Sequence, residues 1–206
     1  MGAYGSEWES KGYCGRGSGG ALINTLQGRP AIIAGNATGV FEQVHVAERE
    51  RPDAVIFGVN DVGMYLPRMD HWVSLHADNL APWRAVRWLH PGAKEDVRYH
   101  SIDPKPYVDV AWEGLTPLFC LSGYFAMQVA WMMGCAPIIL CGCPGSPTPR
   151  FFERAPRADF GYGSGVQGSD TSVREQVEKE MRRVPEFKAA VRSMSGGWSS
   201  EYFGRP

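Results

Sequence analysis

The sequence has no long apolar run, no long run of basic residues and no secretory leader pattern. No stretch approaches about 18 uninterrupted apolar residues, so we expect no membrane-spanning helix and no membrane partner. The first residues lack the basic and then apolar plan of a signal peptide, so we expect a cytoplasmic location. Duplex-DNA binders usually carry a basic stripe, and the formal net charge here is −1, so nucleic acid is not an expected partner.

Cysteine is scarce and unevenly placed. The chain has five cysteines, an odd number, and Cys120, Cys135 and Cys141 lie in apolar runs, which predicts buried free thiols rather than disulfides. The Cys141-Gly142-Cys143 triplet has no two further ligands at a suitable spacing. We therefore expect no metal site and no redox motif there.

What remains is the composition of an ordinary globular chain. Hydrophobic residues make up 44% of the 206 residues and charged residues 21%, which fits one α/β domain with a substantial core. Residues 1–28 are rich in glycine and serine and show little periodicity, so we interpret them as a flexible N-terminal arm. Residues 29–206 then form a single domain.

The chain is organised around residues 31–60. An apolar run at 31–35, a glycine-containing turn, a helical stretch at 39–50 and a second apolar run at 54–60 predict a β-α-β unit with two parallel strands. Ligands of such units sit beyond the carboxyl ends of the strands. Further strands are expected at 71–76, 97–101, 137–142 and 190–194, and further helices at 79–89, 122–134 and 169–187.

Two loops follow the two central strands. Gly35 lets the backbone approach a ligand closely, and Gly39 opens a helix whose free amides suit an anion such as a phosphate. The spacing matches neither a Walker motif nor the dinucleotide fingerprint. Asn60 and Asp61 offer hydrogen bonds to a base or a ribose. In each case the alternative is a local turn without a ligand.

Other polar groups join this edge. His76 ends the third expected strand and suits a general base or a hydrogen-bond donor, whereas His71 is interpreted as a core or surface histidine. Ser122-Gly123 and Ser195-Gly196 can each place a hydroxyl and backbone amides near an anion. Ser122 lacks the G-x-S-x-G context of a nucleophile.

These motifs resemble those of known families. Segment 32–39, IIAGNATG, is similar to the GNGPS loop of bacterial family-42 sialyltransferases, the motility accessory factor and the MptE-like pterin pyrophosphokinase group, and Gly58–Asp61, Ser122–Ala126 and Ile138–Gly142 resemble their later motifs. The resemblance implies a Rossmann-like core that handles a nucleotide or a nucleotide-sugar. The implied nucleotide contacts are Gly35, Asn36, Thr38 and Asn60, with a site wall from Ser122 and Gly123.

A closer resemblance is to small uncharacterised phage and prophage proteins, sometimes labelled "norphogenetic". It rests on segments 59–61, 70–76, 191–196 and 203–204, and it implies no particular activity. Unlike the sialyltransferases, the chain has no histidine after His100. A catalytic base would therefore be His76, Asp61 or Asp78.

We therefore predict a three-layer Rossmann-like α/β domain with a mostly parallel sheet of five or six strands. The expected function is that of a phage-type glycosyltransferase-like enzyme, with the phosphate on the Gly35–Gly39 turn, Ser122, Gly123 and Ser195 nearby, and His76 at the transferred group. No cofactor or metal is expected beyond the nucleotide ligand. The alternative is a non-catalytic nucleotide-binding protein or a partner of a phage or host protein. A magnesium-dependent phosphotransferase and a homo-oligomer are left open.

Overall fold

The computed structural model describes residues 18–90, 92–93, 96–113, 115, 121–146, 148–152 and 164–206. Seven strands form one sheet in the order β5-β4-β3-β2-β1-β6-β7, and every pair of neighbours is parallel. The strands are β1 (Ala31–Ala34), β2 (Val55–Val59), β3 (His71–Val73), β4 (Arg98–Ser101), β5 (Val110–Ala111), β6 (Ile138–Cys141) and β7 (Val191–Ser193). The predicted three-layer α/β fold is confirmed.

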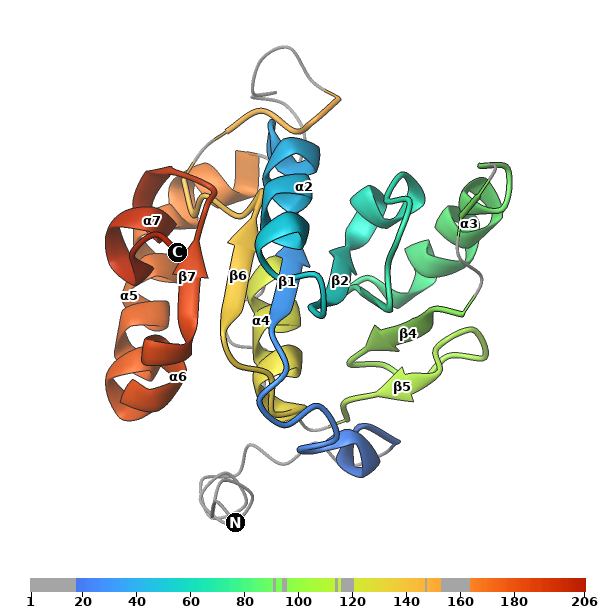
Figure 1. The fold of residues 1–206 in the computed structure, drawn as a ribbon, viewed down its shortest axis with the longest axis horizontal. Coiled ribbons are helices and arrows are strands. Elements are labelled where there is room, and N and C mark those ends of the chain that lie inside the picture. The colour runs from blue at the N-terminus through green and yellow to red at the C-terminus, as the bar shows by residue number, and fades with distance from the viewer. Residues whose placement is uncertain are drawn as a thin grey trace.

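Helices cover both faces of the sheet, with α2 and α4 on opposite sides of β1 and β6 (Figure 1). The described helices are α2 (Val40–Glu50), α3 (Ala77–Arg87), α4 (Ser122–Met132), α5 (Ser164–Arg183), α6 (Pro185–Ala190), α7 (Gly197–Phe203) and the 3-10 helices η1 (Ser18–Leu22) and η2 (Asn60–Met64). Within the described ranges, no helix combines the length and the apolar character needed to cross a bilayer.

Alternation along β1 explains the two cores. Ala31 and Ile33 belong to the core under α4, whereas Ile32 and Ala34 belong to the core under α2. Successive side chains of a strand point to opposite faces, so a strand covered on both faces must be apolar at every position. This is why the central strands stand out in the sequence as uninterrupted apolar runs.

The strand order places a switch point between β1 and β6. From β1 the chain moves outward through β2, β3, β4 and β5, and it then returns to the other side of β1 as β6 and β7. Ala34 lies opposite both Gly58 and Cys141, so β1, β2 and β6 end at the same level. Ligands of open parallel sheets bind in the crevice that this reversal creates.

The predicted strand count was too low, and several element boundaries differ from the expected ones, two of them for a clear local reason. The seventh strand is β5. It was not predicted because it is only two residues long and lies in a proline-rich segment without a readable pattern. The strand expected at 71–76 ends at Val73, where Ser74 Oγ accepts a hydrogen bond from the amide of His76. The helix expected at 169–187 begins earlier, at Ser164, and ends at Arg183, because Pro185 has no amide proton and disfavours helical geometry at the preceding residue.

The N-terminal segment is partly described. Residues 18–28 of the expected arm form η1 and a turn, and Leu22, Ile23 and Leu26 pack against the core under α4. Residues 1–17 lie outside the described residues. Cys135 and Cys141 are buried free thiols, as predicted, whereas Cys120 lies outside the described residues.

Two histidines lie inside the core under α4. His71 Nδ1 and His100 Nε2 are 2.8 Å apart, and Trp112 Nε1 donates to His100 Nδ1 at 3.1 Å. Because an indole N–H only donates, His100 Nδ1 must be the acceptor, and the proton of the neutral ring then sits on Nε2 and points to His71. Phe57 stacks on His71 with ring centroids 4.6 Å apart.

Candidate functional site

The turn after β1 is held by the loop after β6. The amides of Gly35 and Ala37 donate to the carbonyls of Cys141 and Gly142, respectively. The amide of Thr38 donates to the carbonyl of Pro149. A Cβ on Gly35 would overlap the carbonyl oxygen of Gly142, so glycine is required here for close approach of the two loops. These three amides are occupied by the protein itself.

At the centre of the site is a contact between the first two loops. Asn36 Nδ2 donates to Asp61 Oδ1, and Arg150 lies 3.7 Å from the other oxygen of that carboxylate. The carboxylate is buried, with 12% of the Asp61 side chain exposed. Asn36 Oδ1 is also buried, and it has no hydrogen-bond partner among the described residues. A buried acceptor without a donor costs free energy unless a ligand or water supplies one.

Asn60 connects the loops after β2 and β3. Its side-chain oxygen accepts a hydrogen bond from Ser74 Oγ at 2.9 Å, and its carbonyl accepts one from Trp72 Nε1 at 2.6 Å. The backbone of Asn60 is left-handed, with φ of 53°, a conformation that asparagine tolerates better than most residues. Asn60 therefore has a clear local role in shaping the turn.

His76 belongs to the loop after β3, and Ser122 contacts this loop. Ser122 Oγ accepts a hydrogen bond from the amide of Leu75 at 3.4 Å, which ties the start of α4 to this loop. His76 is exposed at the position preceding α3, and its amide donates to Ser74. Ser122 is the first residue of α4, and Asp78 lies in the first turn of α3.

Ser195 anchors the loop after β6. Its hydroxyl accepts from the amide of Cys143 at 2.8 Å and donates to the carbonyl of Leu140 at 3.1 Å. The sulfur of Cys143 would lie 3.1 Å from a Cβ on Gly123, so this loop passes close to the start of α4. Burial raises the pKa of the Cys143 thiol to about 12, which keeps it protonated and a poor nucleophile at neutral pH.

Thr38 contacts a later part of the loop after β6, at Pro149 and Arg150. Its hydroxyl faces the carbonyls of Pro149 and Arg150 at 3.0 and 3.3 Å, and Phe151 donates its amide to the carbonyl of Asn36. Ala37 and Arg150 also form an isolated antiparallel bridge. These contacts explain how Arg150 reaches Asp61. Sequence reasoning missed Arg150 because it lies in a proline- and glycine-rich loop without periodicity.

The predicted residues therefore fall into one connected group along the carboxyl edge. Direct contacts join the turn after β1 to the loop after β2 and to the loop after β6. A further contact joins the loop after β3 to α4, and another joins the loop after β7 to the loop after β6. Gly39, exposed with φ of 82°, precedes α2. Among the described residues, no group of three or more histidine, cysteine or acidic side chains is arranged to hold a metal.

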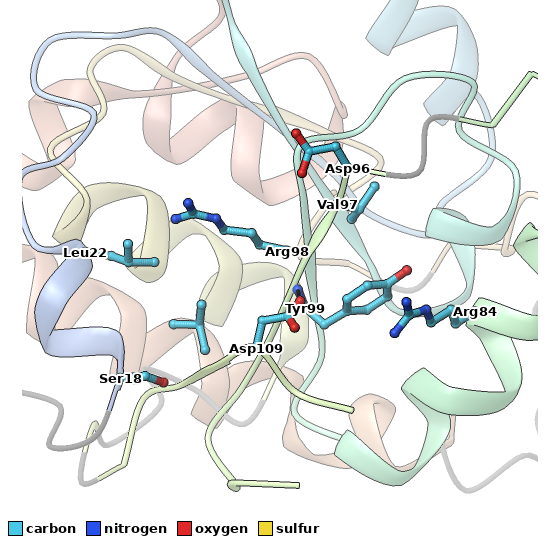
Figure 2. Close-up of a pocket in the computed structure, with 9 residues that line it drawn as sticks. Ser18, Leu22, Arg84, Asp96, Val97, Arg98, Tyr99 and Asp109 are labelled. Atoms are coloured by element: carbon cyan, nitrogen blue, oxygen red, sulfur yellow. Dashed lines mark hydrogen bonds between the residues drawn. The ribbon is translucent and has the colours of Figure 1, made fainter. Parts of the chain in front are cut away.

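A cavity of about 520 Å³ lies elsewhere, beside the first residues of β4. Figure 2 shows the Tyr99 ring extending toward Arg84, while Arg98 extends away from both. Asp109 accepts a hydrogen bond from the amide of Tyr99, and the Arg84 guanidinium lies 4.8 Å from the Tyr99 ring centre. None of the residues that were predicted from the sequence to bind a ligand lines this cavity.

The fold and its edge define an open, all-parallel, Rossmann-like α/β protein with polar groups at the carboxyl edge of its central strands. No family model, no curated protein and no solved structure matches the chain. The resemblances to sialyltransferase-like and phage proteins therefore stay predictions.

Proposed function

We propose that the chain binds a nucleotide or nucleotide-sugar at the carboxyl edge of β1, β2 and β6 and acts as a glycosyltransferase-like enzyme. The observation that carries this proposal is the Asn36–Asp61 pair, whose Asn36 Oδ1 is a buried acceptor without a donor. A ribose hydroxyl supplies the missing donor. Cytoplasmic location and phage origin belong to the same proposal.

The charges at the site suit a phosphorylated ligand. Arg150 is partly exposed beside Asp61, so its guanidinium can pair with the carboxylate and still reach a phosphate. The Asn36 amide orientation is fixed because its NH₂ group faces an acceptor-only carboxylate. The pair therefore presents an acceptor to a sugar hydroxyl and a cation to an anion.

In the transfer step, an acceptor hydroxyl attacks the anomeric carbon of the donor sugar. The bond from that carbon to the phosphate oxygen breaks, and the nucleotide leaves with the electron pair. His76, exposed at the start of α3, takes the proton of the hydroxyl. Asp61 is assigned to binding rather than proton transfer, because both of its oxygens are engaged by Asn36 and Arg150.

Ligand binding is tested by thermal shift and calorimetry with CMP, UMP, GDP, ADP and their sugar conjugates. A ligand at 100 times its dissociation constant adds about 2.7 kcal/mol of stability. Asn36→Ala and Asp61→Asn should each weaken binding by about 1–3 kcal/mol, because a buried hydrogen-bond partner is lost. Asp53→Asn, an exposed carboxylate before β2, is the matched control and should leave affinity unchanged. Full affinity in both site variants would remove this edge as the binding site.

Turnover is tested separately with His76→Ala. We expect loss of sugar transfer or hydrolysis by 10²-fold or more, roughly the contribution of a general base, with nucleotide affinity retained. His45→Ala, an exposed histidine on α2, is the control. Unchanged turnover in His76→Ala would exclude His76 as the base.

A non-catalytic nucleotide-binding protein is the second candidate. It is favoured by the full engagement of the Asp61 carboxylate within the protein, which suits recognition better than acid–base chemistry. Binding with no transfer to any acceptor and no hydrolysis of any donor in the panel would select this candidate.

A further inference from the structure

Four aromatic rings gather over the loop that carries Arg150. Phe151 is the centre, with Phe41, Tyr65 and Phe152 packed edge to face around it at centroid distances of 5.2, 5.6 and 5.0 Å. Three of them are unusually exposed: Phe41 by 38%, Tyr65 by 45% and Phe152 by 56%. We call these four residues the aromatic platform.

The platform is contributed by three separate elements. Phe41 lies in the first turn of α2, Tyr65 follows η2, and Phe151 and Phe152 follow β6 in the same loop as Arg150. Because no short segment supplies all four rings, their convergence is a property of the tertiary fold. Since each of the three outer rings is more than a third exposed, the platform presents aromatic surface to solvent.

The platform adjoins the polar centre of the site. Phe151 donates its amide to the carbonyl of Asn36, and the Arg150 guanidinium lies 5.9 Å from the centre of the Phe152 ring. Arg150 in turn pairs with Asp61. Partly exposed aromatic rings thus lie beside an unpaired buried acceptor, a carboxylate and a cation.

The geometry points to a nucleobase as the occupant of the platform, with its ribose on Asn36 and Asp61. This inference rests on the proposed nucleotide-binding function and adds where the base lies. A nucleobase is planar and stacks on aromatic side chains and on guanidinium groups with little dependence on its identity. The combination of ring faces and Arg150 suits such a group better than a flexible aliphatic chain.

The experiment compares ligands with and without a base. Binding of CMP, UMP, GMP, AMP and ribose 5-phosphate is measured by calorimetry for the wild type, Tyr65→Ala, Phe152→Ala and Phe152→Trp. Each alanine variant should bind the nucleotides about tenfold more weakly, equivalent to about 1.4 kcal/mol, while affinity for ribose 5-phosphate stays unchanged. Phe152→Trp, which retains a ring face, should keep the affinity for nucleotides. Trp88→Ala, with a 64% exposed ring outside the platform, is the control.

The outcomes separate the inference from the proposed function. Tight nucleotide binding that survives both alanine variants overturns the platform as the base subsite and leaves the proposed function standing. The same holds if nucleotide and ribose 5-phosphate affinities fall together, because the loss is then not specific to the base. A wild-type chain that binds none of the four nucleotides overturns both.

Discussion

Replacing Gly35 with alanine is expected to destabilise the fold by about 3 kcal/mol or more, at the upper end of overpacking effects in a core. The new methyl group would meet the sulfur of Cys143 and the backbone carbonyl oxygen of Gly142, and the carbonyl cannot rotate away without moving the loop after β6. That loop is tied down because the amide of Gly35 donates to Cys141 and the amide of Cys143 donates to Ser195. Chemical denaturation of wild type and variant measures the difference.

Two further variants show whether the carbonyl is the obstacle. Cys143→Ala in the Gly35→Ala background removes the sulfur but leaves the carbonyl of Gly142, so little stability should return. Gly123→Ala meets only the Cys143 sulfur at 3.1 Å and gains helix propensity at the start of α4, so its effect should be near zero. Recovery of most of the stability in the double variant would show that the sulfur, and not the backbone, sets the requirement for glycine.

Much of the fold could be predicted because its central strands are covered on both faces. Such strands must be apolar throughout, and they are bounded by turn residues, so β1, β2 and β6 are visible in the sequence. Within residues 90–117 only one strand, at 97–101, could be assigned, and it corresponds to β4. There the two-residue strand β5 and the buried His100 and Trp112 acquire their places from tertiary pairing, for which no local periodicity exists.

The candidate site was chosen from the sequence, and its location stays a prediction, whereas its internal contacts could not be predicted at all. Asn36 and Asp61 follow adjacent parallel strands, which is why both were candidates. Their direct hydrogen bond could not be predicted from local pattern. The pairing with Arg150 depends on a loop that Thr38 holds in place, although Thr38 and that loop are more than a hundred residues apart in the sequence. The hydroxyls of Thr38 and Ser195, predicted to face a ligand, make hydrogen bonds with backbone groups of the protein itself.

The free energy of unfolding should fall by about 2 kcal/mol between pH 7.5 and 5 because of His71 alone. Burial is the main cause that lowers the pKa of His71 to about 4, and nearby Arg98 and Arg29 act in the same direction against the opposing effect of Asp70. In the unfolded chain this histidine takes up a proton near pH 6.5, so the unfolded state is favoured as the pH falls from about 6.5 toward 4. Burial also lowers the pKa of His100 well below its usual value, which adds a loss of the same sign.

Urea denaturation at half-unit pH steps tests this dependence. His71→Gln removes the titrating group and keeps an acceptor for the Nε2–H of His100, so the variant should be less stable at pH 7.5 yet lose less stability on acidification. His45→Gln, which changes an exposed histidine on α2, should follow the wild-type profile. An unchanged pH slope in His71→Gln would mean that His71 is not a source of the acid sensitivity. A shallower slope would show that proton uptake by His71 in the unfolded chain accounts for part of the acid sensitivity.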